Sequence, residues 1–208
     1  MNNRGLVAAL SAAFCLAMAP ATVIAAPPAG QVLALNGQPA LVSAGQRLPL
    51  KLGDAVGVGD SVEVPAGSKL KLRMNDGSVL SLAAGSQMTI KAYDVDGSGQ
   101  RRDAQLSLPG GLLRAVVASV NQPAQFEVDT AVGTAAVRST DWFIESRPGS
   151  AQVGVLAGTV DLTSLATRRT VAIPARWGAR LEAGRDPVPP RVWAPAEFDD
   201  VIGRTNVN

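Results

Sequence analysis

The sequence contains no histidine and only one cysteine, Cys15. Without histidine the chain has no Ser-His-Asp or Cys-His catalytic system, no histidine-ligated zinc site and no imidazole acid or base. Cys15 lies in an amino-terminal segment that we expect to be removed, so the remaining chain has neither thiolate chemistry nor disulfides. These absences predict that the protein is not an enzyme, and we expect no cofactor and no metal site.

Paired carboxylates are the acid–base chemistry that these absences leave open. Asp94 with Asp96, and Asp199 with Asp200, are two such pairs. Neighbouring acids in polar loops are usually solvated turn residues, so we predict no catalytic residue among them.

Charge is sparse and balanced. Charged residues make up 17% of the chain, and the formal net charge is +2. Binding of nucleic acid needs a concentrated basic face. We therefore expect no nucleic-acid partner.

The amino terminus has the pattern of a secretory signal peptide. Arg4 precedes an apolar run, Leu6 to Met18, and Val23-Ile24-Ala25 supplies the small residues that signal peptidase reads. Cleavage after Ala25 is favoured, because a cut one residue later would place Pro27 first in the mature chain. We predict a signal peptide over residues 1–25 and a periplasmic or secreted protein.

A membrane anchor is the alternative for the same segment. The apolar run is rich in alanine, is followed by Pro20 and has no positive cluster after it, which disfavours an anchor. A lipoprotein is disfavoured because Phe14 is too large for the position before the modified cysteine. No later apolar stretch reaches about 18 residues, so we expect no membrane span in the mature chain.

Alternating apolar residues between positions 62 and 90 indicate half-buried strands. The apolar members are Val62, Val64, Leu70, Leu72, Met74, Leu80, Leu82, Met88 and Ile90. These apolar residues occupy even-numbered positions both before and after a turn, and a three-residue loop at 75–77 explains this. This loop pairs Leu72 with Leu80 and requires Gly77 in the left-handed region, where glycine has no Cβ penalty. We therefore expect Gly77→Val to destabilise the fold and Ser78→Ala to be nearly silent.

Similar patterns recur downstream. Residues 126–128 and 142–144 are predicted strands, and residues 153–155 and 160–162 are predicted to form a hairpin around a four-residue loop. Only residues 112–120 are compatible with a helical turn or two. The sequence predicts an all-β fold of about ten to twelve short, mainly antiparallel strands in a sandwich or roll.

The predicted chain has four parts. The signal peptide at 1–25 is followed by a leader and first strands at 26–52, and by the β domain at 53–184. Residues 185–208 are a proline-rich linker and a tail, which we expect to dock through Trp193 and Phe198.

The residues of the β domain resemble the FecR domain of bacterial envelope proteins. The resemblance covers about Gly53 to Gly184 and rests on "GDSVEVPAGSKLKLRMNDGSVLSLAAGSQMTI", "LSLPGGLLRAVV", "FEVDTAVGTAAVRSTDWFIE" and "VGVLAGTVDLTS". The chain departs from the family pattern at Ser139, where family members usually have glycine in an Arg-x-Thr-Asp corner. If that position has a positive φ, Ser139 strains the corner or alters it.

The resemblance implies a role in regulation. Well-known members are membrane-spanning regulators of sigma factors, with a cytoplasmic anti-sigma region before the membrane helix. Only five residues precede the apolar run here, so the resemblance implies a stand-alone secreted form that lacks that region. Cell-surface signalling related to sigma-factor regulation remains an alternative.

Two non-catalytic functions fit this picture. The first is an interaction, regulatory or scaffold module that binds another envelope protein, through an exposed strand edge for example. The second is a ligand- or glycan-binding module, for which Trp142, Trp177 and Trp193 are candidate platforms. Arg138 and Asp141, three residues apart at the corner, are candidate binding residues together with Trp142, or else they stabilise the bend.

The segment from Asp94 to Gln105 resembles the first half of a calcium-binding loop. Its last position is Gln105 instead of glutamate, and Arg101 and Arg102 add positive charge. We therefore interpret the segment as a polar hairpin loop and expect no tight binding of calcium.

Overall fold

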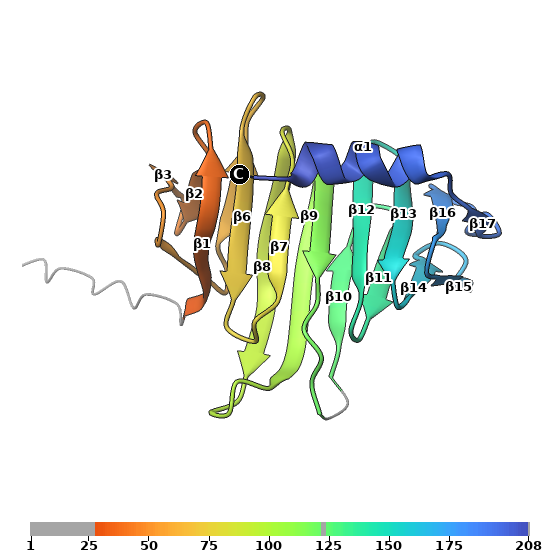
Figure 1. Ribbon diagram of the computed structural model, residues 1–208, viewed down its shortest axis with the longest axis horizontal. Coiled ribbons are helices and arrows are strands. Elements are labelled where there is room, and N and C mark those ends of the chain that lie inside the picture. Colours follow the sequence, from red (N-terminus) through yellow and green to blue (C-terminus); the bar gives the residue numbers. More distant parts are fainter. Residues whose placement is uncertain (1–27, 122–123, 208) are drawn as a thin grey trace, which may run out of the picture.

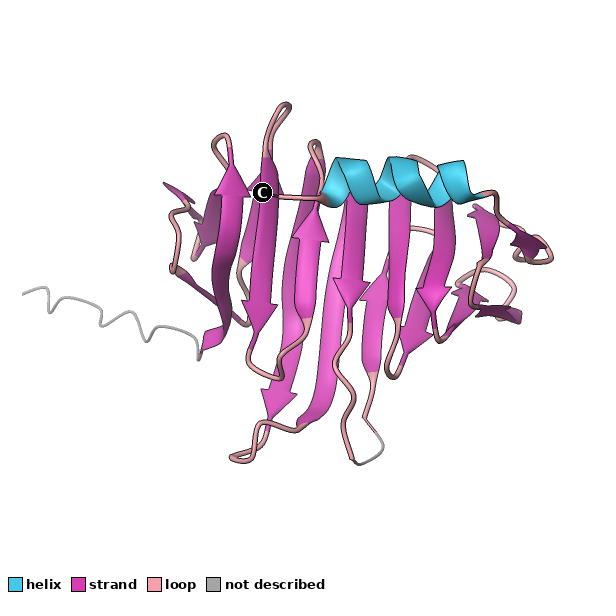
Figure 2. Ribbon diagram, in the orientation of Figure 1, coloured by secondary structure: helices cyan, strands magenta, loops and turns pink. Residues whose placement is uncertain are grey.

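The computed structural model describes residues 28–121 and 124–207, and the predicted signal peptide lies outside them. The described chain forms two layers of β-strands with one helix on the outside of one layer (Figures 1 and 2). Within the described residues no helix is long and apolar enough to cross a membrane. The predicted all-β class is confirmed.

The strands are more numerous than the ten to twelve that the sequence predicted. The structure has β1 (Pro28–Asn36), β2 (Ala40–Ser43), β3 (Gln46–Pro49), β4 (Ala55–Gly57), β5 (Ser61–Val64), β6 (Lys69–Met74), β7 (Val79–Leu82), β8 (Ser86–Val95), β9 (Arg101–Val116), β10 (Phe126–Asp129), β11 (Gly133–Val137), β12 (Asp141–Arg147), β13 (Ser150–Ala157), β14 (Thr159–Ser164), β15 (Thr170–Pro174), β16 (Trp177–Glu182), β17 (Arg191–Val192) and α1 (Pro195–Thr205). The excess consists mainly of strands of two to five residues, whose alternation is too short to identify from sequence.

The strands divide between two sheets that share β9. The first sheet has the order β4-β1-β6-β7-β9-β12-β13-β16-β17. The second has the order β3-β2-β5-β8-β9-β10-β11-β14-β15. Every pairing is antiparallel except that of β9 with β10.

Strand β9 passes from one layer to the other at a glycine pair, Gly110-Gly111. Gly111 has φ +99°, and a Cβ atom there would lie 2.3 Å from the Cα of Ser86. A larger residue is therefore excluded both by backbone conformation and by space. The long strand thus joins the two layers into one hydrogen-bonded network.

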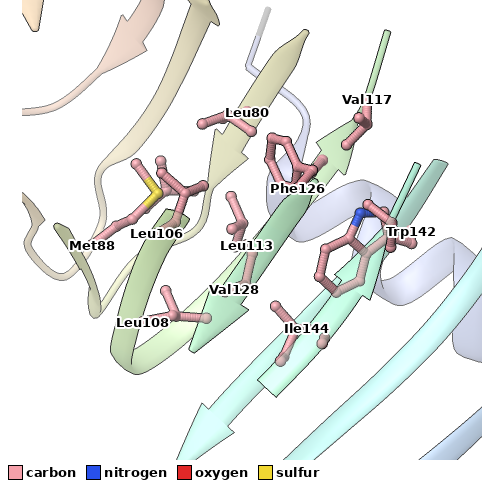
Figure 3. Close-up of a cluster of buried hydrophobic side chains, with 14 of the residues drawn as sticks. Leu80, Met88, Leu106, Leu108, Leu113, Val117, Phe126, Val128, Trp142 and Ile144 are labelled. Atoms are coloured by element: carbon pink, nitrogen blue, oxygen red, sulfur yellow. The ribbon is translucent and has the colours of Figure 1, made fainter. Parts of the chain in front are cut away.

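The core lies between the layers and is built from the alternating residues that the sequence identified. Leu70, Leu72, Leu80, Met88 and Ile90 are each 0% exposed. Figure 3 shows such side chains from neighbouring strands directed toward one another. The half-buried strands predicted from period-two alternation are confirmed.

The predicted loop between β6 and β7 is also confirmed. Leu72 pairs with Leu80, and Leu70 pairs with Leu82. Gly77 has φ +85°, in the left-handed region that glycine adopts without strain.

Two local predictions are wrong. Residues 153–162 do not form a hairpin, because β13 pairs in the first sheet and β14 in the second. Gly158, with φ +90°, turns the chain from one layer to the other. Leu112 to Val116 form the end of β9 instead of a helix, because they pair with β7 and β12.

The carboxyl-terminal segment docks as predicted and contains an unpredicted helix. Figure 1 shows α1 lying across the outer face of the first sheet. Trp193 and Phe198 are 6% and 4% exposed and pack with Phe143 of β12. The helix begins at Pro195, where the missing N–H costs nothing, and the carboxylate of Glu197 accepts the N–H of Ala194 at 2.9 Å.

Candidate functional site

The corner at residues 138–141 does not assemble the predicted binding residues. Arg114 donates two hydrogen bonds to Asp141, at 3.0 and 2.8 Å, so Asp141 pairs with β9 instead of Arg138. Trp142 is 0% exposed and lies in the core between the layers (Figure 3). Of the three candidates, Arg138 is exposed, Asp141 is half-buried and Trp142 is buried.

Ser139 does not strain this corner. Among the described residues, non-glycine residues with positive φ are Ala44, Arg168 and Arg176. The hydroxyl of Ser139 lies 2.6 Å from that of Ser119. The position beside this corner that requires glycine is Gly158, because a Cβ atom there would lie 2.8 Å from the carbonyl oxygen of Ser139.

Behind the corner lies a buried ion pair that sequence analysis missed. Arg101 and Asp76 form a salt bridge in which both side chains are 0% exposed. Arg101 also donates to the carbonyl oxygen of Arg138 at 2.9 Å, and its guanidinium lies 5.4 Å from the ring centre of Phe126. The pair therefore joins the β6–β7 loop, the start of β9 and the corner.

Two neutral groups complete this network. The hydroxyl of Tyr93 donates to Asp76 at 2.7 Å, and the hydroxyl of Ser78 donates to Asp76 at 2.8 Å and accepts the N–H of Ala118 at 3.0 Å. Burial, and then the negative charge of Asp76, raise the pKa of Tyr93. Because Ser78 is 0% exposed and bonds on both sides, we now expect Ser78→Ala to destabilise the fold, in place of the nearly silent change that the sequence suggested.

The residues of this network can be read in the sequence, but the sequence alone does not indicate that they interact. Asp76 has the identity of an ordinary turn residue, and Arg101 follows a polar loop. Nothing in their spacing indicates that the two meet inside the molecule. The network is structural, and its ion-paired side chains, Asp76 and Arg101, have no surface available to a ligand.

An open hollow on the outer face of the second sheet is the best candidate for a functional site. Register places Glu127, Ala136 and Asp161 side by side on neighbouring strands β10, β11 and β14. Their neighbours in each strand face the core, so these three side chains face outward. The small side chain of Ala136 leaves a space between two carboxylates.

Arg138 lies at the end of the same hollow. It follows Ala136 by two residues and therefore shares its face. The space measures about 360 Å³, and its lining also includes Gln125, Thr140 and Thr159. The hollow thus combines two acids, one arginine and several neutral polar groups.

Electrostatics distinguish Glu127 within this hollow. Its pKa is raised, first because burial disfavours the ionised form and then because Asp129 and Asp103 add negative charge. A cation that approaches Glu127 would favour the ionised form of its carboxyl group and so oppose this shift. The hollow is therefore suited to a positively charged group placed between Glu127 and Asp161, with a negative group beside Arg138.

Residues 94–105 form a hairpin, as the sequence predicted. Strands β8 and β9 flank a loop at 96–100, in which Asp96 accepts the N–H groups of Ser98 and Gln100 at 2.9 and 3.1 Å. Among the described residues, no three or more His, Cys, Asp and Glu side chains are grouped to hold a metal ion.

The remaining tryptophans lie near the carboxyl-terminal helix. Trp193 packs between Phe143 and Phe198, with ring centres 5.3 and 5.6 Å away. Trp177 begins β16 and is 37% exposed. Neither contributes to the hollow.

Comparison with known proteins agrees with this architecture. A family model described as "FecR protein" matches residues 60–161. Two crystal structures of a candidate anti-sigma factor from Parabacteroides distasonis ATCC 8503 match at 14% identity, with TM-scores of 0.56 and 0.55. Each match covers 67% of this chain and 62% of that protein, and at this identity it shows a shared fold alone. A comparison with curated proteins gave no match.

Proposed function

Residues 60–161 of the chain belong to the FecR family, and from this premise we propose that the protein is a non-catalytic interaction module of the bacterial envelope. It acts by contact with another envelope protein, and the outer-face hollow is its contact site. The family and the fold shared with a candidate anti-sigma factor support a regulatory role. The periplasmic or secreted location is part of the proposal, supported by the signal-peptide pattern of residues 1–25.

The observation that carries the proposal is the charge arrangement of the hollow. Glu127 and Asp161 flank Ala136, and Arg138 lies at one end. A partner that places a lysine or arginine between the two acids, and a carboxylate beside Arg138, would satisfy all three charges. Such complementarity fixes the register of two proteins and rejects partners of the wrong charge.

Hydrolysis of a glycan is the function that the same acids would otherwise suggest. Glycosidases need two carboxyl groups about 5–10 Å apart. The strands that carry Glu127 and Asp161 are separated by one strand, so their backbones lie roughly 10 Å apart, at the upper end of that range. Glycan sites also use exposed aromatic platforms, whereas Phe126, the aromatic residue of the lining, is 0% exposed. Binding is therefore the better supported function.

Photo-crosslinking in cells tests the proposal. A photoreactive residue at Thr159, which lines the hollow and is exposed, is expected to give one discrete adduct with an envelope protein. The adduct should weaken when Glu127→Gln and Asp161→Asn are added. The same residue at Gln46, exposed on β3, is the control. Equal adducts at both positions, or an adduct unaffected by loss of the two acids, would contradict the proposal.

A further inference from the structure

The second surface of interest is the open edge of the second sheet. In the described part of the chain the two sheets end in four edge strands, of which β4, β17 and β3 have three, two and four residues. Strand β15, with five residues, is the longest, and it lies at one end of the molecule (Figure 1). An unpaired edge of this kind is a template for a strand from another chain.

Alternate residues of β15 direct their backbone N–H and C=O groups away from β14, the strand with which β15 pairs. The N–H of Ser164 donates to the carbonyl oxygen of Arg169 at 2.9 Å. Antiparallel pairs alternate between bonded and non-bonded residues, so Thr170 and Ala172 direct their N–H and C=O groups outward. The backbone hydrogen bonds of the described residues include none from these outward groups.

Two arginines mark the start of this edge. Arg168 and Arg169 are exposed, and neither has a carboxylate within salt-bridge distance in the described parts of the chain. Arg168 has φ +61°, where glycine would be free of strain. Arg176 also has a positive φ, but its guanidinium lies 5.6 Å from the ring centre of Phe198 and so contributes to helix docking. Among residues 28–121 and 124–207, no side-chain contact gives Arg168 such a role.

We propose that the β15 edge accepts an extended, acidic segment of a partner protein. The segment pairs with the outward groups of Thr170 and Ala172, and its carboxylates lie beside Arg168 and Arg169. This inference rests on the proposed interaction function and names a second contact of the same module. The edge adjoins the hollow, because Asp161 of β14 pairs with Ala172.

Charge decides against a second copy of this chain as the occupant. An antiparallel pairing of two β15 strands about Ala172 would bring Arg168 and Arg169 of one copy near Arg176 of the other. Like charges across a strand pair are destabilising. The opposite charge on the partner turns the same positions into favourable contacts.

Peptide binding to the purified protein tests this inference directly. The probe is an extended peptide of alternating threonine and valine that ends in two glutamates, and a matched peptide ends in two glutamines. We expect the acidic peptide to bind more tightly by about tenfold, because two exposed ion pairs are lost in the neutral one. Amide hydrogen exchange should slow at Thr170 and Ala172 when the acidic peptide is bound.

Two variants separate edge pairing from general charge attraction. Ala172→Pro removes an outward N–H that bonds nothing in the sheet, so the fold should be retained while peptide affinity falls about tenfold or more. Arg168→Gly should raise the melting temperature by relieving strain, yet weaken the acidic peptide severalfold. Arg47→Gln, on the opposite edge strand β3, is the matched control and should leave affinity unchanged.

The outcomes are distinct from those of the crosslinking experiment. Equal affinity for the acidic and neutral peptides, or full affinity in Ala172→Pro, would overturn the edge inference while leaving the hollow intact. Tight binding of a sulfated polysaccharide that Ala172→Pro does not affect, with no binding of the acidic peptide, would also overturn it. Equal adducts at Thr159 and Gln46, or a Thr159 adduct that persists after Glu127→Gln and Asp161→Asn, would instead refute the proposed function.

Discussion

At the scale of residues, a buried polar network holds the molecule at its corner. Asp76 accepts hydrogen bonds from Arg101, Ser78 and Tyr93. A buried ion pair costs desolvation free energy, which these additional hydrogen bonds offset. The main effect of the network is therefore to determine which loops meet, and its net contribution to stability is smaller. Each member of the network depends on the others.

Asp76→Ala is expected to destabilise the protein strongly. The change leaves the guanidinium of Arg101 buried and without its carboxylate, which costs about 3–5 kcal/mol. Denaturant unfolding measures the loss, and Asp94→Ala, at an exposed position in β8, is the control. A loss no larger than that of the control would show that the pair is not buried in solution.

The pKa of Tyr93 provides a pH test of the same network. Burial and then Asp76 raise it above the usual value of about 10. Above that pH the unfolded chain loses the tyrosine proton while the folded chain keeps it, so stability should fall as pH rises. Tyr93 is the only tyrosine, so ultraviolet absorbance reports it alone. Ionisation near the usual pKa without loss of structure would contradict this prediction.

At the scale of elements, two devices shape the molecule: tight loops with left-handed glycines, and a helix laid across the first sheet. The β6–β7 loop depends on Gly77 at φ +85°. The helix depends on apolar contacts and on the salt bridge from Arg204 to Glu145 at 2.6 Å. The loop belongs to the sandwich, whereas the helix covers its outside, so their loss should have different consequences.

Gly77→Val should destabilise the whole sandwich by about 1–3 kcal/mol. A β-branched residue is strained at positive φ, and the loop sets the register of β6 with β7. Thermal unfolding measures the effect. Gly45→Val in the exposed β2–β3 turn has a similar φ of +79° and gives a matched comparison away from the buried network. An unchanged melting temperature for Gly77→Val would refute the three-residue loop.

Phe198→Ala should release α1 while leaving the sandwich folded. The side chain is 4% exposed and contacts both Phe143 and Trp193. Hydrogen exchange is expected to accelerate in residues 195–205 and to remain slow in β12. Asp199→Ala, exposed on the same helix, is the control. Equal protection of the helix in both variants would show that Phe198 does not hold it.

At the scale of the whole molecule, period-two alternation was enough to predict the class and the core. Leu70, Leu72 and Leu80 were placed correctly because alternation and an odd loop length determine which face each side chain occupies. Strand partners were harder to predict. The segment around Gly158 looks like a hairpin locally, but its two strands belong to different layers.

The candidate site shows the same limit. Arg138 was identified from its place in the corner motif, but the hollow also needs Glu127, Ala136 and Asp161 from three different strands. Their proximity follows from strand order, including the parallel pairing of β9 with β10. A single sequence gives no local signal for that order, so the hollow became visible only in three dimensions.

The most direct test of the interaction function is to measure affinity for the partner protein that the photoreactive residue at position 159 captures. Titration calorimetry should compare the wild type with a variant carrying Glu127→Gln, Arg138→Gln and Asp161→Asn, and mass spectrometry should follow the partner. We predict that the variant binds about tenfold or more weakly and that the mass of the partner does not change. Equal affinity, or a partner that is chemically converted by the wild type, would contradict a non-catalytic contact made through the hollow.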